Sequence, residues 1–528
     1  MNLSRLCVLY GLELVLLSTV FSKAEVRQKA SRVQNGRAYY IDSARGNDNN
    51  SGSKPHSAWK TLAKVNATTF VAGDRILFKA GDLWTGQLWP KGSGTAEHPI
   101  VIDKYGVKGR PVINAAGNAE DAVRLKNQEY WEINSLEITN WGSAPGPRRG
   151  VNVIAENSGD LHHIYIRNLD IHDVNGIDSD KANGGIMYHC EGDKKPSRFV
   201  DLRIEGNRIH HVDRSGILGW STHWTRSKWY PSLGVLIKNN LLNDIGADGI
   251  VPVATDGAIV EYNVVANANQ RSEGYNDGIW PWSADNTIVQ FNEVYGMKGL
   301  HDGMAFDADW NSRNTIIQYN YSHDNEGGFL LICNEGSQKP EDSVGNVGTI
   351  VRYNISQNDH HRSINISGPV NNTSIYNNTI YVGNENIDLL VQSDWNGWST
   401  NTYLYNNIFY VTGSGKFSHA ISHGNDGVYT TVSGIEANQH TVFDSNAYFG
   451  KIELPADAHA LKSDPSFAYP GHAGVGRAST TVYRLRPGSP AAKSGRMAPH
   501  FGGRDFFGTV VPSCAIDRGA VQLSKSCE

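Results

Sequence analysis

The sequence predicts an all-β right-handed parallel β-helix, a solenoid with an N-terminal cap and a C-terminal capping tail. Two observations carry this prediction, a recurring motif and its spacing. The motif is apolar-x-x-Asn-x-apolar, and its asparagines are Asn207, Asn240, Asn263, Asn292, Asn320, Asn354, Asn378 and Asn407. The seven intervals from Asn207 to Asn407 cover 200 residues, about 29 each, with steps from 23 to 34.

A repeat of this length is too long for one hairpin, and it shows no apolar stripe of helical period. One full coil per repeat, stacked on the next at the ~4.8 Å spacing of paired strands, accounts for it. Each asparagine then lies at the same turn, where its amide can bond to the asparagines above and below. A β-propeller is the alternative, but its blades need about 40 residues and carry no asparagine column.

Composition supports strands, turns and flat aromatic surfaces rather than helices, with 55 Gly, 23 Tyr and 13 Trp against 5 Met. The formal net charge is −5, so the chain lacks the basic surplus that nucleic-acid binding requires, and no nucleic acid is expected as a partner. Cys190 and Cys333 lie in apolar contexts and are expected to be buried thiols. Cys514 and Cys527 could form a disulfide in an oxidising compartment.

Residues 1–24 have the pattern of a signal peptide. Arg5 precedes an apolar run at 12–21, and Ser22-Lys23-Ala24 is a small-x-small cleavage site. The run is shorter than the ~20 residues that a membrane-spanning helix needs. We therefore expect a secreted or periplasmic monomer, with no membrane span after signal removal.

The rest of the chain divides by composition and by the repeat. We expect a flexible lead-in at 25–36, an N-terminal cap and first coils at 37–115, coils with the asparagine column at 116–450, and a C-terminal capping segment at 451–528. Two insertions, 219–231 and 334–345, lengthen their coils and should protrude as loops. The first of them should form a wall at one side of a groove.

A second element recurs six to fourteen residues after the asparagines: a polar residue, glycine and an apolar strand start. Its polar residues are Ser215, Asp248, Asp277, Asp302 and Glu326. In register, these acids would form one column with neighbours about 5 Å apart. Stacked carboxylates repel one another, so one pKa rises while another acid stays ionised, and glycosidic cleavage uses such a pair. Alternatively, Asp-Gly is a common turn pair.

The segment from His301 to Trp310 concentrates charge around Asp302. Strand alternation is expected to turn Met304 and Phe306 inward and Asp307 and Asp309 outward. The candidate catalytic residues are Asp277, Asp302, Asp307 and Glu326. The candidate substrate-binding residues are Asp248, Trp280, Trp282, His301, Asp309, His323 and Arg362. The tryptophans could serve as sugar platforms or as packing.

An acidic cluster of this kind could instead hold Ca²⁺, which binds six to eight oxygens. The sequence has no linear calcium-loop signature, so no cofactor is expected to be required. Calcium remains the alternative, and no metal ligands are assigned.

The two ends of the chain carry a family resemblance. Residues 39–48, 59–62 and 73–78 near the start, with 505–508 and 515–520 near the end, resemble secreted bacterial right-handed parallel β-helix proteins of the pectate-lyase-like superfamily, which act on carbohydrates. With the asparagine repeat, this covers nearly all of the mature chain. The group contains glycoside hydrolases, lyases and epimerases, so the resemblance implies the fold more than the substrate. The paired Asp-Asp motif of polygalacturonases is absent.

Three functions follow as hypotheses. The first is an extracellular glycoside hydrolase that degrades a polysaccharide or oligosaccharide through paired carboxylates on a solvent-facing sheet. The second is a polysaccharide lyase acting on a uronic-acid polymer, in which a base takes the proton next to the carboxylate. Its candidate bases and cations are Lys298, His301, Arg313 and Arg362. The third is a non-catalytic glycan-binding β-helix.

Overall fold

The computed structural model describes residues 36–422, 429–432 and 440–523. The predicted signal peptide, nearly all of the lead-in and Cys527 lie outside this part of the chain. Strands dominate the described residues, together with one short helix, α1 (Leu62–Asn66), and the 3₁₀ segments η1 (Pro55–Ser57), η2 (Arg226–Lys228) and η3 (Arg477–Tyr483). No helix among them is long and apolar enough to cross a membrane.

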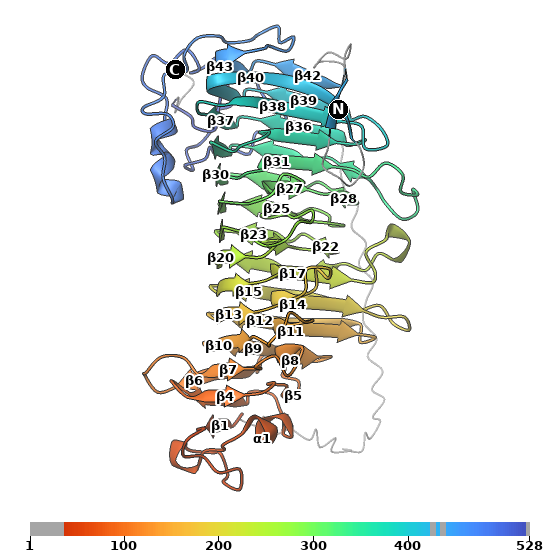
Figure 1. The fold of residues 1–528 in the computed structure, drawn as a ribbon, viewed down its shortest axis with the longest axis vertical. Coiled ribbons are helices and arrows are strands. Elements are labelled where there is room, and N and C mark those ends of the chain that lie inside the picture. The colour runs from red at the N-terminus through yellow and green to blue at the C-terminus, as the bar shows by residue number, and fades with distance from the viewer. Residues whose placement is uncertain (1–35, 423–428, 433–439, 524–528) are drawn as a thin grey trace, which may run out of the picture. The chain divides into compact units, whose positions relative to one another are not determined.

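The strands stack into three parallel ladders, called A, B and C here, and Figure 1 shows the stack from β1 to β43. Ladder A contains β1 (Ala38–Ile41), β3 (Arg75–Lys79), β6 (Ile100–Tyr105), β9 (Trp131–Asn134), β12 (Asp160–Arg167), β15 (Arg198–Glu205), β19 (Leu236–Lys238), β23 (Ile259–Glu261), β25 (Ile288–Gln290), β29 (Ile316–Gln318), β33 (Ile350–Arg352), β36 (Asn371–Tyr376), β39 (Thr400–Tyr405) and β42 (Thr441–Asp444).

Ladder B contains β4 (Leu83–Thr85), β7 (Val112–Asn114), β10 (Glu137–Asn140), β13 (Asp170–Val174), β16 (Arg208–Val212), β20 (Leu241–Ile245), β24 (Val264–Ala266), β26 (Glu293–Tyr295), β30 (Tyr321–His323), β34 (Ile355–Gln357), β37 (Thr379–Val382) and β43 (Ala447–Ile452). The long strand β40 (Ile408–Ser422) pairs first in ladder B and then in ladder C.

Ladder C contains β8 (Asp121–Lys126), β11 (Arg149–Glu156), β14 (Gly184–Glu191), β17 (Ser215–Ser221), β21 (Ile250–Val251), β27 (Met304–Ala308), β31 (Gly328–Cys333), β35 (Ile364–Ser367) and β38 (Asn386–Ser393). Ile279 bridges β21 and β27. Seven short strands complete the coils, namely β2 (Thr69–Phe70), β5 (Lys91–Gly92), β18 (Ser232–Leu233), β22 (Thr255–Asp256), β28 (Ser312–Arg313), β32 (Asn346–Val347) and β41 (Tyr429–Thr431).

The predicted asparagine column is present between ladders A and B. Asn240 Nδ2 donates to Asn263 Oδ1 at 2.9 Å and to the Ile204 carbonyl at 2.9 Å, and the same pattern runs from Asn207 to Asn446. The residue before each of these asparagines has a φ between 51° and 66°. Only Gly206 among them is a glycine, so the asparagine bonds hold most of these turns in a conformation that side chains disfavour. The parallel β-helix prediction is therefore confirmed.

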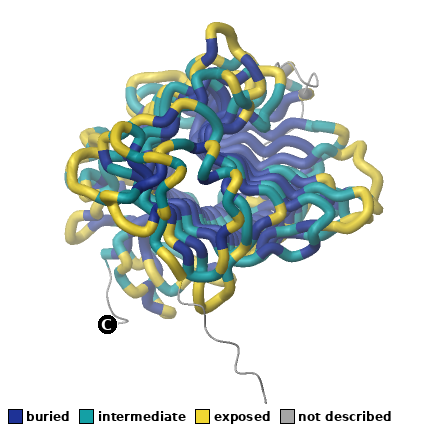
Figure 2. Tube along the Cα trace, turned by 90° about the horizontal axis from the view of Figure 1, so that it is seen from below, coloured by how far each residue is buried: buried dark blue, intermediate teal, exposed yellow. Residues whose placement is uncertain are grey.

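The inside of the coils is a continuous apolar core of aliphatic and aromatic side chains. Figure 2, which looks along the stack, shows buried residues along the strands and exposed residues in the outer loops. Cys190 and Cys333 are free and buried, as predicted. Cys514 is disulfide-bonded.

The C-terminal segment closes the stack only in part. Asp457 accepts bonds from the Asn446 side chain and main chain, at 3.0 and 2.9 Å, and so ends the asparagine column. The following residues run back beside ladder B, where η3 lies next to β30 and β37 in Figure 1. Tyr483 and Phe506 there pack with Tyr321 and Ile408. The prediction of a capping tail thus describes Glu453 to Leu461, whereas the later residues cover a side of the coils.

Candidate active site

The outward face of ladder C carries the acidic residues. Met304 lies outward as well, in a cluster with Leu331 and Cys333, while Ala305 and Phe306 both belong to the core. The inward prediction for Met304 is wrong, because two consecutive residues of β27 face the core and shift the alternation. Asp307 and Asp309 lie outward as predicted, with Asp307 only 3% exposed.

The acids do not form one column. Asp248 and Asp277 precede the bridged residues Ile250 and Ile279 by two positions, so they lie side by side. Because Ile279 bridges Phe306, the next place in this column belongs to Met304. Asp302 lies two residues before it, in the turn that leads into β27. The predicted single column is therefore wrong, since the turn before β27 is arranged differently from those before Ile250 and Ile279.

Asp248 is a fully buried, neutralised anion. Its carboxylate accepts from Lys181 Nζ at 3.1 Å, from Arg214 Nη1 at 3.0 Å and from Trp280 Nε1 at 3.0 Å. Two cations and an indole therefore satisfy it. Trp280 is itself 9% exposed and packs with Leu218 and Val251, so packing is the observed role of this tryptophan.

Asp277 and Asp307 are buried acids with raised pKa values. Asp277 Oδ1 accepts the Met304 main-chain N–H at 2.7 Å. Burial has the largest effect and the charge of Asp302 the second largest, and both raise the pKa of Asp277 well above its ordinary range. Burial, followed by the charge of Asp309, raises the pKa of Asp307 in the same way. Asp307 Oδ1 is buried with no hydrogen-bond partner among the described residues. In both carboxyls, burial therefore favours the protonated form over the ionised form.

Asp302 and Asp309 are the two partly exposed acids of the group. Burial raises the pKa of Asp302 to about 7; the charge of Arg362 opposes this rise and that of Asp309 adds to it. Burial also raises the pKa of Asp309 to about 6, although hydrogen bonds from the Cys333 thiol at 2.9 Å and the Trp310 N–H at 2.7 Å favour its ionised form. Each of the two carboxyls therefore changes its protonation state near neutral pH, and both are accessible to solvent.

Other predicted residues lie apart from this group. Glu326 accepts from the Gly299 N–H at 2.8 Å and pairs with Lys298 at 3.2 Å, which lowers its pKa. His301 is exposed and its ring stacks on Tyr275. Arg362, in contrast, is buried near the group, with Nη2 3.4 Å from the His301 carbonyl.

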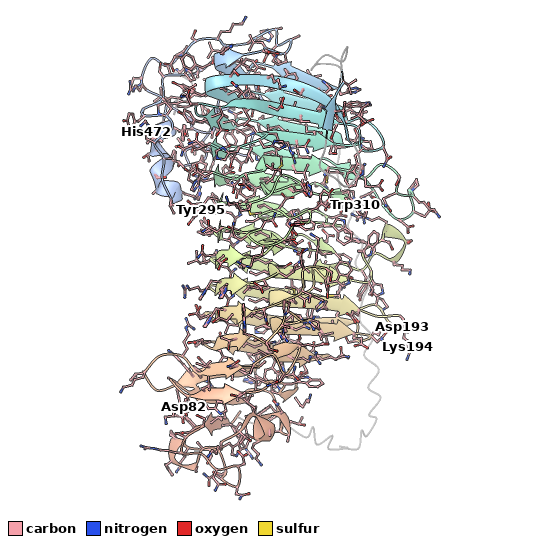
Figure 3. The ribbon with its side chains drawn as sticks, in the orientation of Figure 1. Asp82, Asp193, Lys194, Tyr295, Trp310 and His472 are labelled. Atoms are coloured by element: carbon pink, nitrogen blue, oxygen red, sulfur yellow. The ribbon has the colours of Figure 1, made fainter. Side chains whose placement is uncertain are left out.

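His323 belongs to ladder B. It is 3% exposed, lies between the rings of Tyr295 and Tyr321, and bonds to Glu293 and Asp324. Although burial opposes protonation, these bonds raise the pKa of His323 to about 9. Figure 3 places Tyr295 and Trp310 at opposite edges of the middle coils. The structure does not bring His323 to the acids of ladder C.

Four tryptophans form an aromatic wall beside Asp309. Trp282 stacks on Trp220 at 6.0 Å and meets Trp224 at 5.1 Å and Trp310 at 5.3 Å between ring centroids. Trp224 comes from the insertion predicted at 219–231, whereas Trp220, also predicted to lie in it, is part of β17, which extends to Ser221. Such partly buried indoles suit the flat faces of sugar rings.

The loop is fixed in place by Arg226. Its guanidinium holds both oxygens of Asp285, at 2.9 and 2.8 Å, and donates to Asn311 Oδ1 at 2.8 Å. Arg226 N and Ser227 Oγ also donate to Asp342 in the second predicted loop. The two insertions therefore contact each other through Asp342.

Cys333 is the neighbour that the sequence did not reveal. Its thiol reaches Asp309 across adjacent coils, and burial raises the pKa of this thiol well above its ordinary range. Among the described residues, Asp307, Asp309 and Cys333 are the group whose ligand atoms lie within 4.8 Å of one another. A thiol is a poor calcium ligand, because Ca²⁺ prefers oxygen, so this donor set does not fit the calcium alternative.

The coil architecture is that of carbohydrate-active parallel β-helix proteins. The chain is similar to a lacto-N-biosidase of Bifidobacterium longum subsp. longum, with 29% identity across 95% of this chain. It spans only 35% of that relative's length.

Solved structures agree with the fold. The GH136 lacto-N-biosidase of Eubacterium ramulus superposes with a TM-score of 0.57 at 25% identity, covering 79% of this chain and 68% of the other. XylC in complex with xylose superposes with a TM-score of 0.54 at 13% identity, covering 93% and 99%, and shows the fold alone. No protein-family model matches the chain.

Proposed function

We propose that the chain is a glycoside hydrolase that uses Asp302 and Asp309 as its reacting pair. The observation that carries this proposal is the pair itself: two solvent-accessible carboxyls with pKa values of about 7 and 6 beside an aromatic wall. Glycosidic cleavage needs one protonated and one ionised carboxyl on the two sides of the bond. The similarity to two lacto-N-biosidases supports the same reaction.

The roles follow from the environment of each acid. Asp302, with the higher pKa, is the proton donor to the leaving glycosidic oxygen. Asp309 is the ionised partner, because the Cys333 and Trp310 donors favour its charged form, and it attacks the anomeric carbon or activates the water that does so. Burial favours the protonated form of Asp277 and Asp307, and a protonated carboxyl can donate a hydrogen bond to the sugar. In either route one C–O bond breaks and the elements of water are added.

The substrate class that we propose is a neutral oligosaccharide with lacto-N-biose at its end. The names of the two relatives support this choice. The apolar run at 12–21 supports export, so we also propose that the mature chain acts outside the cytoplasm. We further propose that it acts as a monomer and requires no metal.

The lyase alternative receives less support from the site. Lys298 pairs with Glu326 and Arg313 with Asp285, at 3.2 and 2.8 Å, so these cations are occupied by carboxylates. A lyase for uronic-acid polymers needs cations that neutralise the substrate carboxylate. The ionised Asp309 would instead repel it.

The test is incubation of the purified mature protein with neutral and uronic-acid oligo- and polysaccharides. New reducing ends and the ultraviolet absorbance of unsaturated products are followed together, with Asp302→Asn as the control. We expect the wild type to produce new reducing ends without ultraviolet absorbance, and Asp302→Asn to produce none. Absorbance would establish the lyase. If no substrate yields a product and the protein still binds glycans, the non-catalytic alternative is established.

A further inference from the structure

A cavity opens on ladder C, in the coils that precede the acids. Its volume is about 650 Å³, within the range of ligand sites. Residues of four adjacent strands, β8, β11, β14 and β17, line it, including Asn152 and Ile154 on β11 and His189 on β14. It lies on the same face as Asp309, because the strands of ladder C continue in register from β11 to β27.

Trp220 links this cavity to the acids. It lines the cavity and stacks on Trp282, which meets Trp310 next to Asp309. In the ladder, Trp220, Val253, Trp282 and Asp309 follow one another in one column. Three coil steps separate Trp220 from Asp309, roughly 14 Å at the spacing of paired strands. One sugar unit advances by roughly one such step, so the cavity lies beyond a bound disaccharide.

Lys181 also joins the two sites. It lines the cavity, and its Nζ lies 4.9 Å from the Trp280 ring and 3.1 Å from Asp248. The segment 179–182 therefore lies between the cavity and the acids. A chain bound along the face would pass this segment and the tryptophan wall without leaving the sheet.

The charges of the cavity balance. Four basic and four acidic side chains line it, and several pair with one another or with Asp121 below. Arg149 Nη2 lies 3.0 Å from Glu120, and Lys126 pairs with Glu156. Asn152 bonds to both His189 and Asp121, at 2.8 and 3.1 Å. An anionic sugar would find no surplus cation here, whereas the hydroxyls of a neutral sugar can both donate and accept.

We infer that this cavity is a distal subsite that binds further units of a neutral glycan chain whose bond is cleaved at Asp302 and Asp309. The inference rests on the proposed function and extends it, because it makes the preferred substrate a chain of roughly four units rather than a disaccharide glycoside. The fixed ion pairs give the cavity a preformed polar lining, which lowers the cost of ordering side chains on binding.

The test uses Ile154→Trp, which fills the cavity and leaves its ion pairs intact. The matched control is Leu241→Trp, at a 44% exposed strand position of ladder B. Two series of neutral oligosaccharides that carry lacto-N-biose are compared, one lengthened at the reducing end and one at the other end. In the wild type, kcat/KM should rise with length in one series. Ile154→Trp should reduce the ratio of kcat/KM for the longest substrate to kcat/KM for the shortest at least tenfold. Leu241→Trp should leave this ratio unchanged.

Direct binding separates this inference from the proposed function. The longest oligosaccharide of each series is titrated calorimetrically into Asp302→Asn, with and without Ile154→Trp. A loss of affinity with Ile154→Trp supports the subsite even where the wild type cleaves nothing, and the hydrolase proposal alone then fails. If the wild type cleaves the substrates, but Ile154→Trp changes the long-to-short ratio of kcat/KM less than twofold and leaves the binding affinity unchanged, the subsite inference is wrong. The hydrolase proposal is then still supported.

Discussion

Replacing Asp302 by asparagine should stabilise the protein while it abolishes activity. The pKa of Asp302 is raised from 3.8 to about 7. A group whose pKa is raised by folding contributes stability that is fully present below the unfolded pKa and is lost as pH rises through the folded pKa. Between pH 4 and pH 8, the ionisation of Asp302 therefore costs the wild type stability that Asp302→Asn, with an uncharged amide at this position, does not lose.

The rise in pKa corresponds to about 4 kcal/mol at about 1.4 kcal/mol per pKa unit. Asp302 is partly exposed, so solvent screening reduces this to about 2 kcal/mol. Urea unfolding at both pH values measures the difference. Asp302→Asn should be more stable than the wild type by about 2 kcal/mol at pH 8, with the gap nearly closed at pH 4.

Asp285→Asn is the matched control, because this carboxylate pairs with Arg226 and Arg313. Burial opposes ionisation of Asp285, but these two bonds lower its pKa, so the control should be less stable than the wild type at pH 8. Equal stability of wild type and Asp302→Asn at both pH values would refute the idea that Asp302 is forced to ionise in an unfavourable site.

Three further predictions concern activity, buried charge and metal. The pH profile of kcat/KM should be narrow and bell-shaped, because Asp309 must ionise near pH 6 and Asp302 must stay protonated to about pH 7; a flat profile from pH 5 to 9 would contradict the assigned roles. Asp248→Asn should cost about 3 kcal/mol in urea unfolding, since it leaves Arg214, 4% exposed in its side chain, with only the exposed carboxylate of Asp178 at 3.4 Å as an ion-pair partner; Asp193→Asn, in an exposed turn, should cost nothing measurable. EDTA should leave the hydrolysis rate unchanged, and restoration of a lost rate by added Ca²⁺ would show that a metal is required.

The repeat made the fold predictable, because one asparagine marks the same turn in every coil and its bonds depend only on its neighbours above and below. The outward faces of Asp307 and Asp309 followed from alternation. The inward reading of Met304 failed because Ala305 and Phe306 both face the core, an irregularity with no residue signature.

The site was only partly predictable for a related reason. The Asp-Gly spacing located Asp248, Asp277 and Asp302 in neighbouring coils but could not show that two cations neutralise Asp248. The pairing of Glu326 with Lys298, and the placement of His323 on ladder B, depend on side-chain directions in turns of variable length. Cys333 was recognised as a buried thiol, yet its bond to Asp309 requires the register of two adjacent coils, which the sequence does not specify.

The central claim, that Asp302 donates the proton and Asp309 acts at the anomeric carbon, is tested most directly by varying the leaving group. Wild type, Asp302→Asn and Asp309→Asn are compared on p-nitrophenyl lacto-N-bioside, whose leaving group needs no protonation, and on an unactivated oligosaccharide ending in lacto-N-biose. Asp302→Asn should lose about 10²–10⁴-fold in kcat on the oligosaccharide and far less on the activated glycoside, whereas Asp309→Asn should lose activity on both. Equal losses for Asp302→Asn on the two substrates, or full activity of Asp309→Asn on either, would contradict the assignment.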